Sequence, residues 1–236
     1  MEKRIFENKK DVAEQFSAYF ANLVDGKSDF HVALSGGSTP KIVFDVLAES
    51  YGKTIDWSKV HFYWGDERCV PPSDDESNFK MTQKHLFSKI EVSKDNIHRI
   101  LGELEPLREA YRYANLIEMN IDLIDDIPQF DLIILGMGDD GHTASIFPHE
   151  INLWHDEKFC VVATHPDSGQ QRISLTGKVI NNAKEVAFLV TGPSKAEKVK
   201  SILDKSEGFE QYPAALVRPS SGKLVWFLDH SAASQL

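Results

Sequence analysis

Four stretches of the chain repeat apolar residues every three or four positions. In the first stretch, Val12, Phe16 and Phe20 recur with the period of an α-helix, and polar residues stand between them. This spacing is typical of an amphipathic helix that packs one face against a core. The predicted helices cover residues 12–24, 41–48, 107–121 and 196–203.

Short apolar runs between these helices predict β-strands, preceded by a short opening strand near the N-terminus. The runs cover residues 30–34, 60–64, 131–135, 159–163, 185–190 and 224–228. Residues 131–135 form the most apolar run, which we expect at the centre of a sheet. Because strands alternate with helices, the pattern predicts an α/β fold with a single doubly wound, mostly parallel sheet flanked by helices, a Rossmann-like arrangement.

Nothing in the pattern divides the chain of 236 residues. We find no internal repeat and no Pro/Ser-rich linker, and the polar segment 71–77 is long enough for a functional loop but short for a domain boundary. We therefore expect one α/β catalytic domain over residues 1–236. In such a sheet, ligands bind beyond the carboxyl ends of the strands, so the loops that follow strands are the candidates for function.

Composition and charge narrow the class of protein. Hydrophobic residues make up 42% of the chain and charged residues 26%, which excludes intrinsic disorder. The 36 acidic and 26 basic residues give a net charge of −10, which argues against nucleic acid or an anionic membrane as a partner. An anionic small molecule would need a local basic pocket.

Cysteine usage and the N-terminal segment indicate the compartment. Cys69 and Cys160 lie in no C-x-x-C motif and near no ligand cluster, so we expect neither a disulfide framework nor a zinc site. The first ten residues lack the apolar run of a signal peptide, and no segment approaches the length of a membrane span. We expect a cytoplasmic protein.

The loop after strand 30–34 carries two glycines followed by hydroxyl side chains. Glycines let the backbone approach a ligand, and the N–H groups of a helix amino end donate to anions. The alternative is an ordinary tight turn in which Pro40 opens the helix. We predict a phosphate-binding loop made of Ser35, Gly36, Gly37, Ser38 and Thr39.

Strand 60–64 is followed by three charged residues, Asp66, Glu67 and Arg68. A guanidinium group is a planar fork that fits phosphate or carboxylate, and a carboxylate can transfer protons. We expect Arg68 to act on the substrate, with Asp66 and Glu67 as accessory groups. The alternative is a solvated loop in which a carboxylate pairs with the arginine.

The loop after strand 131–135 contains the sharpest motif. Gly136, Gly138 and Gly141 match G-x-G-x-x-G, the pattern of dinucleotide-binding sites. We reject that interpretation because the expected acidic residue about 20 positions later is missing. Two adjacent aspartates, Asp139 and Asp140, would also repel a pyrophosphate.

The same loop carries His142 two residues after Asp140. An imidazole accepts a proton near neutral pH, and a nearby carboxylate can orient it. This spacing indicates that His142 is a general base and that Asp140 orients it. The alternative is a structural histidine.

Two further cations, Arg172 and Lys195, follow later strands. Both suit an anion, and the alternative is that both side chains are simply exposed to solvent.

Taken together, these motifs resemble the glucosamine-6-phosphate isomerase/6-phosphogluconolactonase family. The matching segments occur in the family's order and cover residues 35–40, 64–68, 136–148, 172–176 and 191–195. The resemblance implies a fold of the sugar-phosphate isomerase type. It also implies hydrolysis of 6-phospho-D-glucono-1,5-lactone to 6-phospho-D-gluconate, in the oxidative pentose phosphate pathway, without a metal or other cofactor.

The resemblance further implies a role for each residue. His142 would activate water for attack on C1 and then protonate the ring oxygen, while Asp140 orients the imidazole. Arg68, Arg172 and Lys195, together with the loop 35–39, would bind the phosphate and place the lactone. The group that stabilises the oxyanion is left open between Arg68 and a backbone N–H.

Two other functions must be weighed. Glucosamine-6-phosphate deaminases carry a glutamate at the position of Phe147, and Glu150 could replace it only in a rearranged loop, so the lactonase is favoured. A non-catalytic phosphosugar sensor would normally carry a DNA-binding segment, which this acidic sequence lacks. The expected partner is the phosphosugar lactone alone, for a monomer or a small homo-oligomer.

Overall fold

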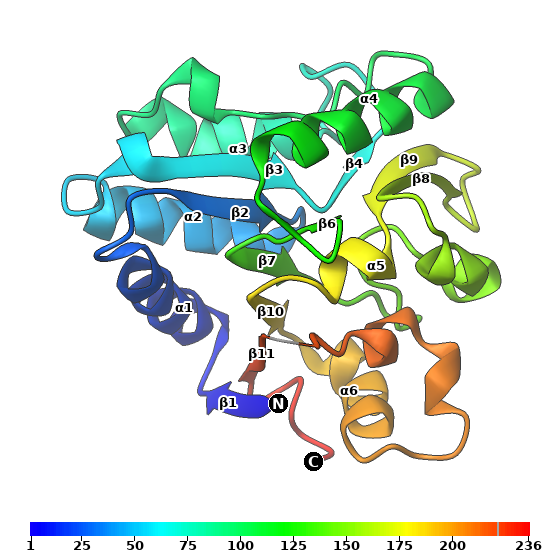
Figure 1. Cartoon of the computed structure of the whole chain (residues 1–236). Helices are drawn as coiled ribbons and strands as arrows, with labels where there is room; N and C mark the ends of the chain where they lie inside the picture. The colour runs from blue at the N-terminus through cyan, green and yellow to red at the C-terminus, as the bar shows by residue number, and fades with distance from the viewer. Residues whose placement is uncertain (221) are drawn as a thin grey trace.

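The structure, a computed structural model, describes residues 1–220 and 222–236. Its central sheet consists of parallel strands in the order β1-β11-β10-β7-β2-β3 (Figure 1). These strands are β1 (Glu2–Phe6), β2 (Phe30–Leu34), β3 (Val60–Trp64), β7 (Leu132–Leu135), β10 (Glu185–Val190) and β11 (Lys223–Asp229). Every residue of β7 and β10 is buried, which confirms the prediction that residues 131–135 lie at the centre of the sheet.

Helices cover both faces of this sheet. All four predicted helices are confirmed, with slightly wider bounds at several ends: α1 (Lys9–Val24), α2 (Ser38–Tyr51), α4 (Pro106–Asn120) and α6 (Ala196–Leu203). Two shorter helices are α3 (Asn78–His85) and α5 (Gly177–Ile180). Since crossovers between parallel strands are right-handed, α1 and α2 cover one face, and α5 and α6, whose crossovers run in the opposite direction across the sheet, cover the other (Figure 1).

The direction of winding reverses between the neighbouring strands β2 and β7. The chain proceeds from β2 to β3 toward one edge of the sheet, and from β7 through β10 to β11 toward the other. At such a reversal, the loops that leave the carboxyl ends of the two strands diverge and open a crevice. Ser35 and Gly136 each come directly after one of these strands, so the two glycine-rich loops meet at this point.

A second, antiparallel sheet lies beside the first. It consists of β4 (Asp66–Arg68), β9 (Gln171–Leu175) and β8 (Cys160–Thr164), in the order β4-β9-β8. The strand predicted at 159–163 is therefore real, but it does not continue the parallel alternation, because a tight turn at 165–170 folds β9 back onto β8 as a hairpin. A further two-stranded ribbon joins β5 (Leu123–Ile124) to β6 (Ile127–Pro128).

The core is continuous and aromatic-rich. Its largest fully buried side chains include Trp64 and Phe62 on β3 and Trp226 on β11. In the part of the chain that the structure describes, no helix is both long enough and apolar enough to cross a membrane.

Candidate active site

A pocket of about 240 Å³ opens where the winding of the sheet reverses. Side chains and backbone from five loops and strands contribute to it. It is lined by Ser35, Gly36, Gly37, Asp66, Arg68, Asn78, Gly136, Met137, Gly138, His142, Ala144, Arg172 and Lys195. Eight of the twelve residues predicted for the site are in this lining; Asp140, Ser38, Thr39 and Glu67 are not.

His142 is held by its neighbours in one orientation. Its Nδ1 lies 2.7 Å from Oδ1 of Asp140, and its backbone N–H donates to the same oxygen at 3.1 Å. The ring also packs against Phe147, with 4.6 Å between the centroids. Because Nδ1 is engaged by the carboxylate, the tautomer with its proton on Nδ1 leaves the lone pair of Nε2 for a substrate or water.

Asp140 stays ionised beside this imidazole. Burial raises its pKa, but the hydrogen bond and positive charge of His142 outweigh burial and bring the pKa to about 2. Gly138 leaves the room that the pair needs, since a Cβ there would lie 2.1 Å from Nδ1 of His142 and 2.5 Å from Oδ1 of Asp140. The carboxylate can therefore stabilise a cationic imidazole throughout the neutral pH range.

The loop 35–39 presents the amino end of α2 to the pocket. Gly37 has a φ of 110°, a conformation that favours glycine, and no side chain among the described residues caps the helix there. Gly36 lies so close to Asn78 that any side chain at position 36 would collide with it. Ser38 and Thr39 are not part of the lining. The hydroxyl of Ser38 accepts a hydrogen bond from Lys9, and the hydroxyl of Thr39 is hydrogen-bonded to that of Thr191. Uncapped N–H groups at a helix amino end are suited to an anion.

Arg68 and Arg172 stand directly opposite each other on β4 and β9. Like charges in this cross-strand position repel each other unless an anion lies between them. The arginine ion pairs of the described residues belong to Arg4, Arg99 and Arg112, and the buried Nε atoms of Arg68 and Arg172 have no partner. Burial lowers the pKa of Arg172, and the charge of Arg68 lowers it further. Two facing guanidinium groups are suited to an anion such as phosphate or carboxylate.

Lys195 reaches the pocket from the turn before α6. Its Nζ lies 2.5 Å from Oδ1 of Asp139, which also accepts a hydrogen bond from Ser194 at 2.9 Å. These two donors lower the pKa of Asp139. Asp139, one of the two aspartates that argued against a pyrophosphate, thus holds the lysine at the pocket. This contact could not be predicted from the local sequence.

Asp66 and Glu67 have different surroundings although they are neighbours. Asp66 is buried at the pocket, where its Oδ2 accepts a hydrogen bond from Ser145 at 2.7 Å. Glu67 points away, into the start of α3, and accepts hydrogen bonds from four donors. They are the backbone N–H groups of Arg68, Asn78 and Phe79 and the hydroxyl of Ser77. Glu67 therefore serves as a cap that ties α3 to β4.

The sequence analysis missed Asn78, Met137 and Ala144 as lining residues. Asn78 is placed by Glu67 and donates from Nδ2 to the carbonyl of Asp66 at 3.0 Å. The only available signal was the Ser-Asn pair that ends the polar segment 71–77, which is common at helix starts. Ala144 has a φ of 48°, unusual for a residue other than glycine.

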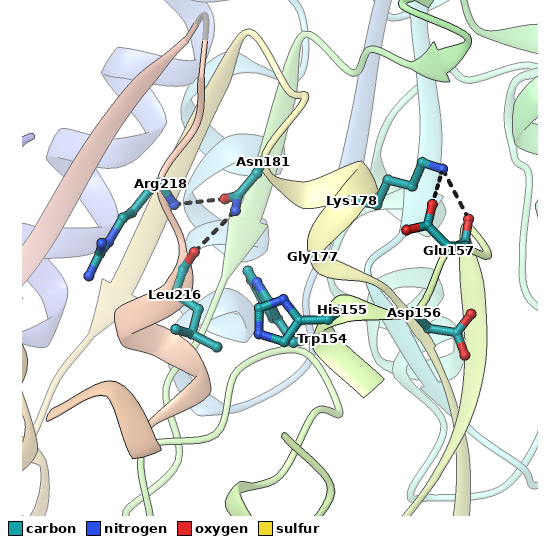
Figure 2. Close-up of a pocket in the computed structure, with 9 residues that line it drawn as sticks. All are labelled: Trp154, His155, Asp156, Glu157, Gly177, Lys178, Asn181, Leu216 and Arg218. Atoms are coloured by element: carbon teal, nitrogen blue, oxygen red, sulfur yellow. Dashed lines mark hydrogen bonds and ion pairs between the residues drawn. The ribbon is translucent and has the colours of Figure 1, made fainter. Parts of the chain in front are cut away.

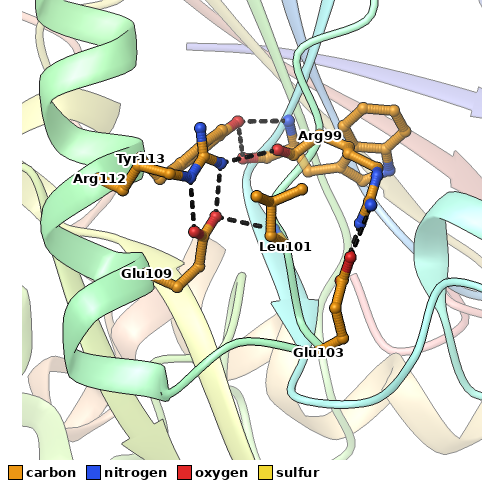
Figure 3. A network of polar contacts seen from close by, with 7 residues as sticks. Arg99, Leu101, Glu103, Glu109, Arg112 and Tyr113 are labelled. Atoms are coloured by element: carbon orange, nitrogen blue, oxygen red, sulfur yellow. Dashed lines mark hydrogen bonds and ion pairs between the residues drawn. The ribbon is translucent and has the colours of Figure 1, made fainter.

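Helix α4 fixes the end of β3, which leads into β4 (Figure 3). The buried hydroxyl of Tyr113 accepts a hydrogen bond from the N–H of Trp64 at 2.8 Å and donates to its carbonyl at 3.0 Å. Glu109 is fully buried, and it accepts from the N–H of Leu101 and from Arg112. Since Trp64 ends β3, this network supports the position of β4 and its arginine.

Another cavity, of about 440 Å³, lies between α5 and the 3₁₀ segment that ends at His155 (Figure 2). None of the predicted site residues lines it. Two of its lining side chains are already paired, Lys178 with Glu157 and Asn181 with backbone groups of Leu216 and Arg218. Eight of the predicted site residues line the pocket at His142 instead.

The described residues contain no group of three or more His, Cys, Asp or Glu side chains arranged to hold a metal ion. That the reaction needs no metal stays a prediction. The groups at the pocket are therefore an oriented imidazole, the amino end of α2 and three cations.

Comparison with known proteins gives a consistent result. The model of the family "Glucosamine-6-phosphate isomerases/6-phosphogluconolactonase" matches residues 7–226. The 6-phosphogluconolactonase of Haemophilus influenzae is 49% identical over 207 residues, 87% of each chain. A crystal structure of devB protein superposes with a TM-score of 0.94 at 43% identity, covering 100% of this chain and 99% of the other. The 6-phosphogluconolactonase structure from Thermotoga maritima gives 0.84 at 31% identity, covering 97% and 99%.

Proposed function

The chain belongs to the glucosamine-6-phosphate isomerase/6-phosphogluconolactonase family, and from this membership we propose that its pocket hydrolyses 6-phospho-D-glucono-1,5-lactone to 6-phospho-D-gluconate with His142 as general base. The activity itself, that of a 6-phosphogluconolactonase and thus of a lactone hydrolase, follows from the close lactonase relatives. The roles of individual residues are our proposal.

His142 carries the proton in both steps. Its Nε2 takes a proton from water as the water oxygen attacks C1, and the carbonyl π electrons move onto the carbonyl oxygen. When this tetrahedral intermediate collapses, the C1–ring oxygen bond breaks and the ring oxygen takes the proton back from His142. Asp140 holds the imidazole and stabilises its cationic form between the steps. The product acid then releases its proton to solvent.

The cations anchor the substrate. Arg68, Arg172 and Lys195 neutralise the phosphate, and the loop 35–39 contributes N–H groups from the start of α2. Fixing the phosphate places C1 at a defined distance from His142, so binding energy is converted into orientation. The single observation that carries this proposal is that Arg68 and Arg172 face each other, with no hydrogen-bond partner among the described residues for their buried Nε atoms, in the pocket that His142 also lines.

The deaminase alternative needs a carboxylate at position 147, where this chain has a phenylalanine. Phe147 occupies the position of the deaminase glutamate, and it is fully buried against the imidazole of His142. Glu150 is engaged elsewhere, because its Oε2 accepts a hydrogen bond from the backbone N–H of Thr164 on β8 at 2.8 Å. Both observations favour the lactonase reaction.

A turnover assay tests the proposal. The purified protein should accelerate hydrolysis of freshly generated 6-phosphogluconolactone, after subtraction of spontaneous hydrolysis, and should release no ammonia from glucosamine 6-phosphate. The lactonase rate should be the same with a chelator present. Ammonia release at a comparable rate would favour the deaminase, and a rate lost on chelation and restored by zinc or magnesium would show a metal requirement.

A further inference from the structure

Residues 143–146 form a short turn whose middle is held in an unfavourable backbone conformation. Ala144 has a φ of 48°, in the left-handed region, where a Cβ meets the following carbonyl. Glycine would adopt this conformation without that steric conflict. Strained residues persist only where their surroundings enforce them, and they concentrate at active sites.

Both neighbours of Ala144 are anchored in the interior. Thr143 is fully buried and donates from Oγ1 to the carbonyl of Gly136 at 2.8 Å. Ser145 is also fully buried, and its hydroxyl donates to Asp66 while its N–H donates to the hydroxyl of Ser174 at 3.2 Å. With both sides fixed, the peptide group between Thr143 and Ala144 has little freedom to rotate.

The N–H of Ala144 is left available. Within the described part of the chain, the turn's backbone hydrogen bond runs from Ile146 to Thr143, and no acceptor is bonded to the N–H of Ala144. Ala144 is partly exposed and lines the pocket two residues after His142. A rigid donor beside the general base is what a developing negative charge on a carbonyl oxygen requires.

We propose that the backbone N–H of Ala144 donates to the carbonyl oxygen at C1 and stabilises its negative charge in the tetrahedral intermediate; this inference rests on the proposed lactonase function. When water adds to C1, the carbonyl π electrons become a lone pair on this oxygen, which then accepts the hydrogen bond. When the C1–ring oxygen bond breaks, the lone pair re-forms the carbonyl. The N–H itself is neither lost nor transferred.

The contacts that Arg68 makes support this assignment. Arg68 already donates from Nη1 to the carbonyl of Glu76, and it faces Arg172 across the ladder, a geometry that suits a phosphate. The turn holds the N–H of Ala144 in place before the substrate arrives, which is what an oxyanion donor requires. The left-handed conformation of an alanine is then the means of aiming this N–H.

Replacing the amide by an ester tests the inference. The substitution Ala144→lactic acid, made by incorporating the α-hydroxy acid, removes the N–H and keeps the side chain. Loss of an oxyanion donor should lower kcat for 6-phosphogluconolactone by about 100-fold or more. The preference for phosphorylated over unphosphorylated gluconolactone, as a ratio of kcat/KM, should be unchanged, because the phosphate contacts are intact.

Two matched variants complete the experiment. Ala144→Gly keeps the N–H in a residue that accepts the same conformation, and it should retain kcat within about threefold. The same ester at Ala114, on α4, controls for the ester linkage and should leave kcat unchanged. If wild type and the Ala114 ester are active and the Ala144 ester keeps more than half of kcat, the inference is overturned and a guanidinium becomes the donor. Absence of lactonase activity in wild type would instead overturn the proposed function.

Discussion

Three neighbouring residues each restrict the position or protonation of the His142 imidazole. Asp140 fixes the ring nitrogen that carries the proton, Phe147 supports one face of the ring, and Gly138 provides the space in which the ring lies. If His142 is the base, as we propose, its imidazole needs little reorganisation before reaction. Substitutions in this set should therefore affect the chemical step more than binding.

Replacing the base should nearly abolish the catalysed step. His142→Asn keeps a polar side chain but cannot accept a proton at neutral pH, so we expect kcat to fall by about 10²-fold or more, with the affinity for 6-phosphogluconate little changed. Asp140→Asn should cost less, because it misorients the base without removing it. Steady-state rates and product binding by calorimetry measure both. A His142→Asn enzyme with more than half of the wild-type kcat would remove the general-base assignment.

Adding one methyl group at Gly138 should have a similar effect without touching any polar atom. The new Cβ would overlap both His142 and Asp140, so Gly138→Ala should displace the imidazole and lower kcat by about tenfold or more while product affinity holds. The control is Gly169→Ala in the turn between β8 and β9, where a Cβ meets no described residue within 4 Å, so the strain that a φ of 68° imposes on an alanine stays in that turn. Equal kcat values for Gly138→Ala and wild type would show that the ring can move without loss.

Removing one guanidinium should separate phosphate recognition from chemistry. Arg172→Ala deletes a charge-assisted contact, and such hydrogen bonds are worth about 1.5–3 kcal/mol, so the affinity for 6-phosphogluconate should fall roughly 10- to 150-fold. Hydrolysis of unphosphorylated gluconolactone should change little. Arg218→Ala, a surface arginine outside the pocket, is the control. Product binding at wild-type affinity in Arg172→Ala would place the phosphate elsewhere.

At the level of elements, the pocket depends on the small antiparallel sheet as much as on the large parallel one. The parallel sheet brings the two glycine-rich loops together, while β4 and β9 bring the arginines together and Glu67 attaches α3. The carboxylate of Glu67 is almost fully buried; burial raises its pKa, and the hydrogen bonds from backbone N–H groups oppose that rise. Its loss should be felt in stability as well as in the pocket.

Neutralising this cap should destabilise the fold. In Glu67→Gln the amide nitrogen faces N–H donors that a carboxylate oxygen accepted, so we expect the free energy of unfolding to fall by about 2–4 kcal/mol. KM should rise as well, because Asn78 loses the contact that places it. Urea denaturation measures the first effect and initial rates the second. Glu91→Gln, at a carboxylate outside this network, serves as the control, and equal midpoints for all proteins would argue against the cap.

The elements that could be predicted from the sequence are those with a long hydrophobic run or a hydrophobic repeat over several turns. Both faces of β7 are buried, and α4 repeats its apolar face over four turns, so each leaves a clear signature. By contrast, β4 is three charged residues long, and its pairing with β9 joins segments far apart in the chain. The opposition of Arg68 and Arg172 follows from that register and not from either local sequence. Asn78 and Ala144 were missed for a similar reason, since tertiary contacts alone place them.

On the scale of the whole molecule, the two ends of the parallel sheet differ in character. The carboxyl ends of the strands carry the pocket, whereas the amino-end halves of β2 and β3 carry stacked histidines. His31 and His61 pair in register, with 4.8 Å between ring centroids, and His98 stacks on Tyr63 at 4.4 Å. This stack is separate from His142 and should contribute its own pH dependence.

Acidification should destabilise the protein through this stack. Burial, and then the charges of His61 and His31, lower the pKa of His98 to about 4, and burial also lowers that of His31. Unfolded histidines titrate near 6.5, so the unfolded state takes up protons that the folded state does not, and the free energy of unfolding should decrease as the pH falls from about 6.5 to about 4.

A single variant isolates this contribution. In His98→Gln the pH-dependent loss over that window should be smaller by on the order of 1 kcal/mol, as measured by denaturation at several pH values. His230→Gln, at an exposed histidine, should leave the profile as it is. Parallel profiles for wild type and His98→Gln would assign the loss to the carboxylates instead.

The order of strands in the parallel sheet also sets the order in which the chain can be completed during synthesis. β1 is an edge strand whose neighbour in the sheet is β11, near the opposite end of the chain. A nascent chain leaving the ribosome therefore carries β1 without this neighbour until β11, at Lys223–Asp229, has been translated. Strands β2 and β7 are translated before β11 and can pair earlier. The loops at the pocket can therefore come together before β1 pairs with β11 at the edge of the sheet.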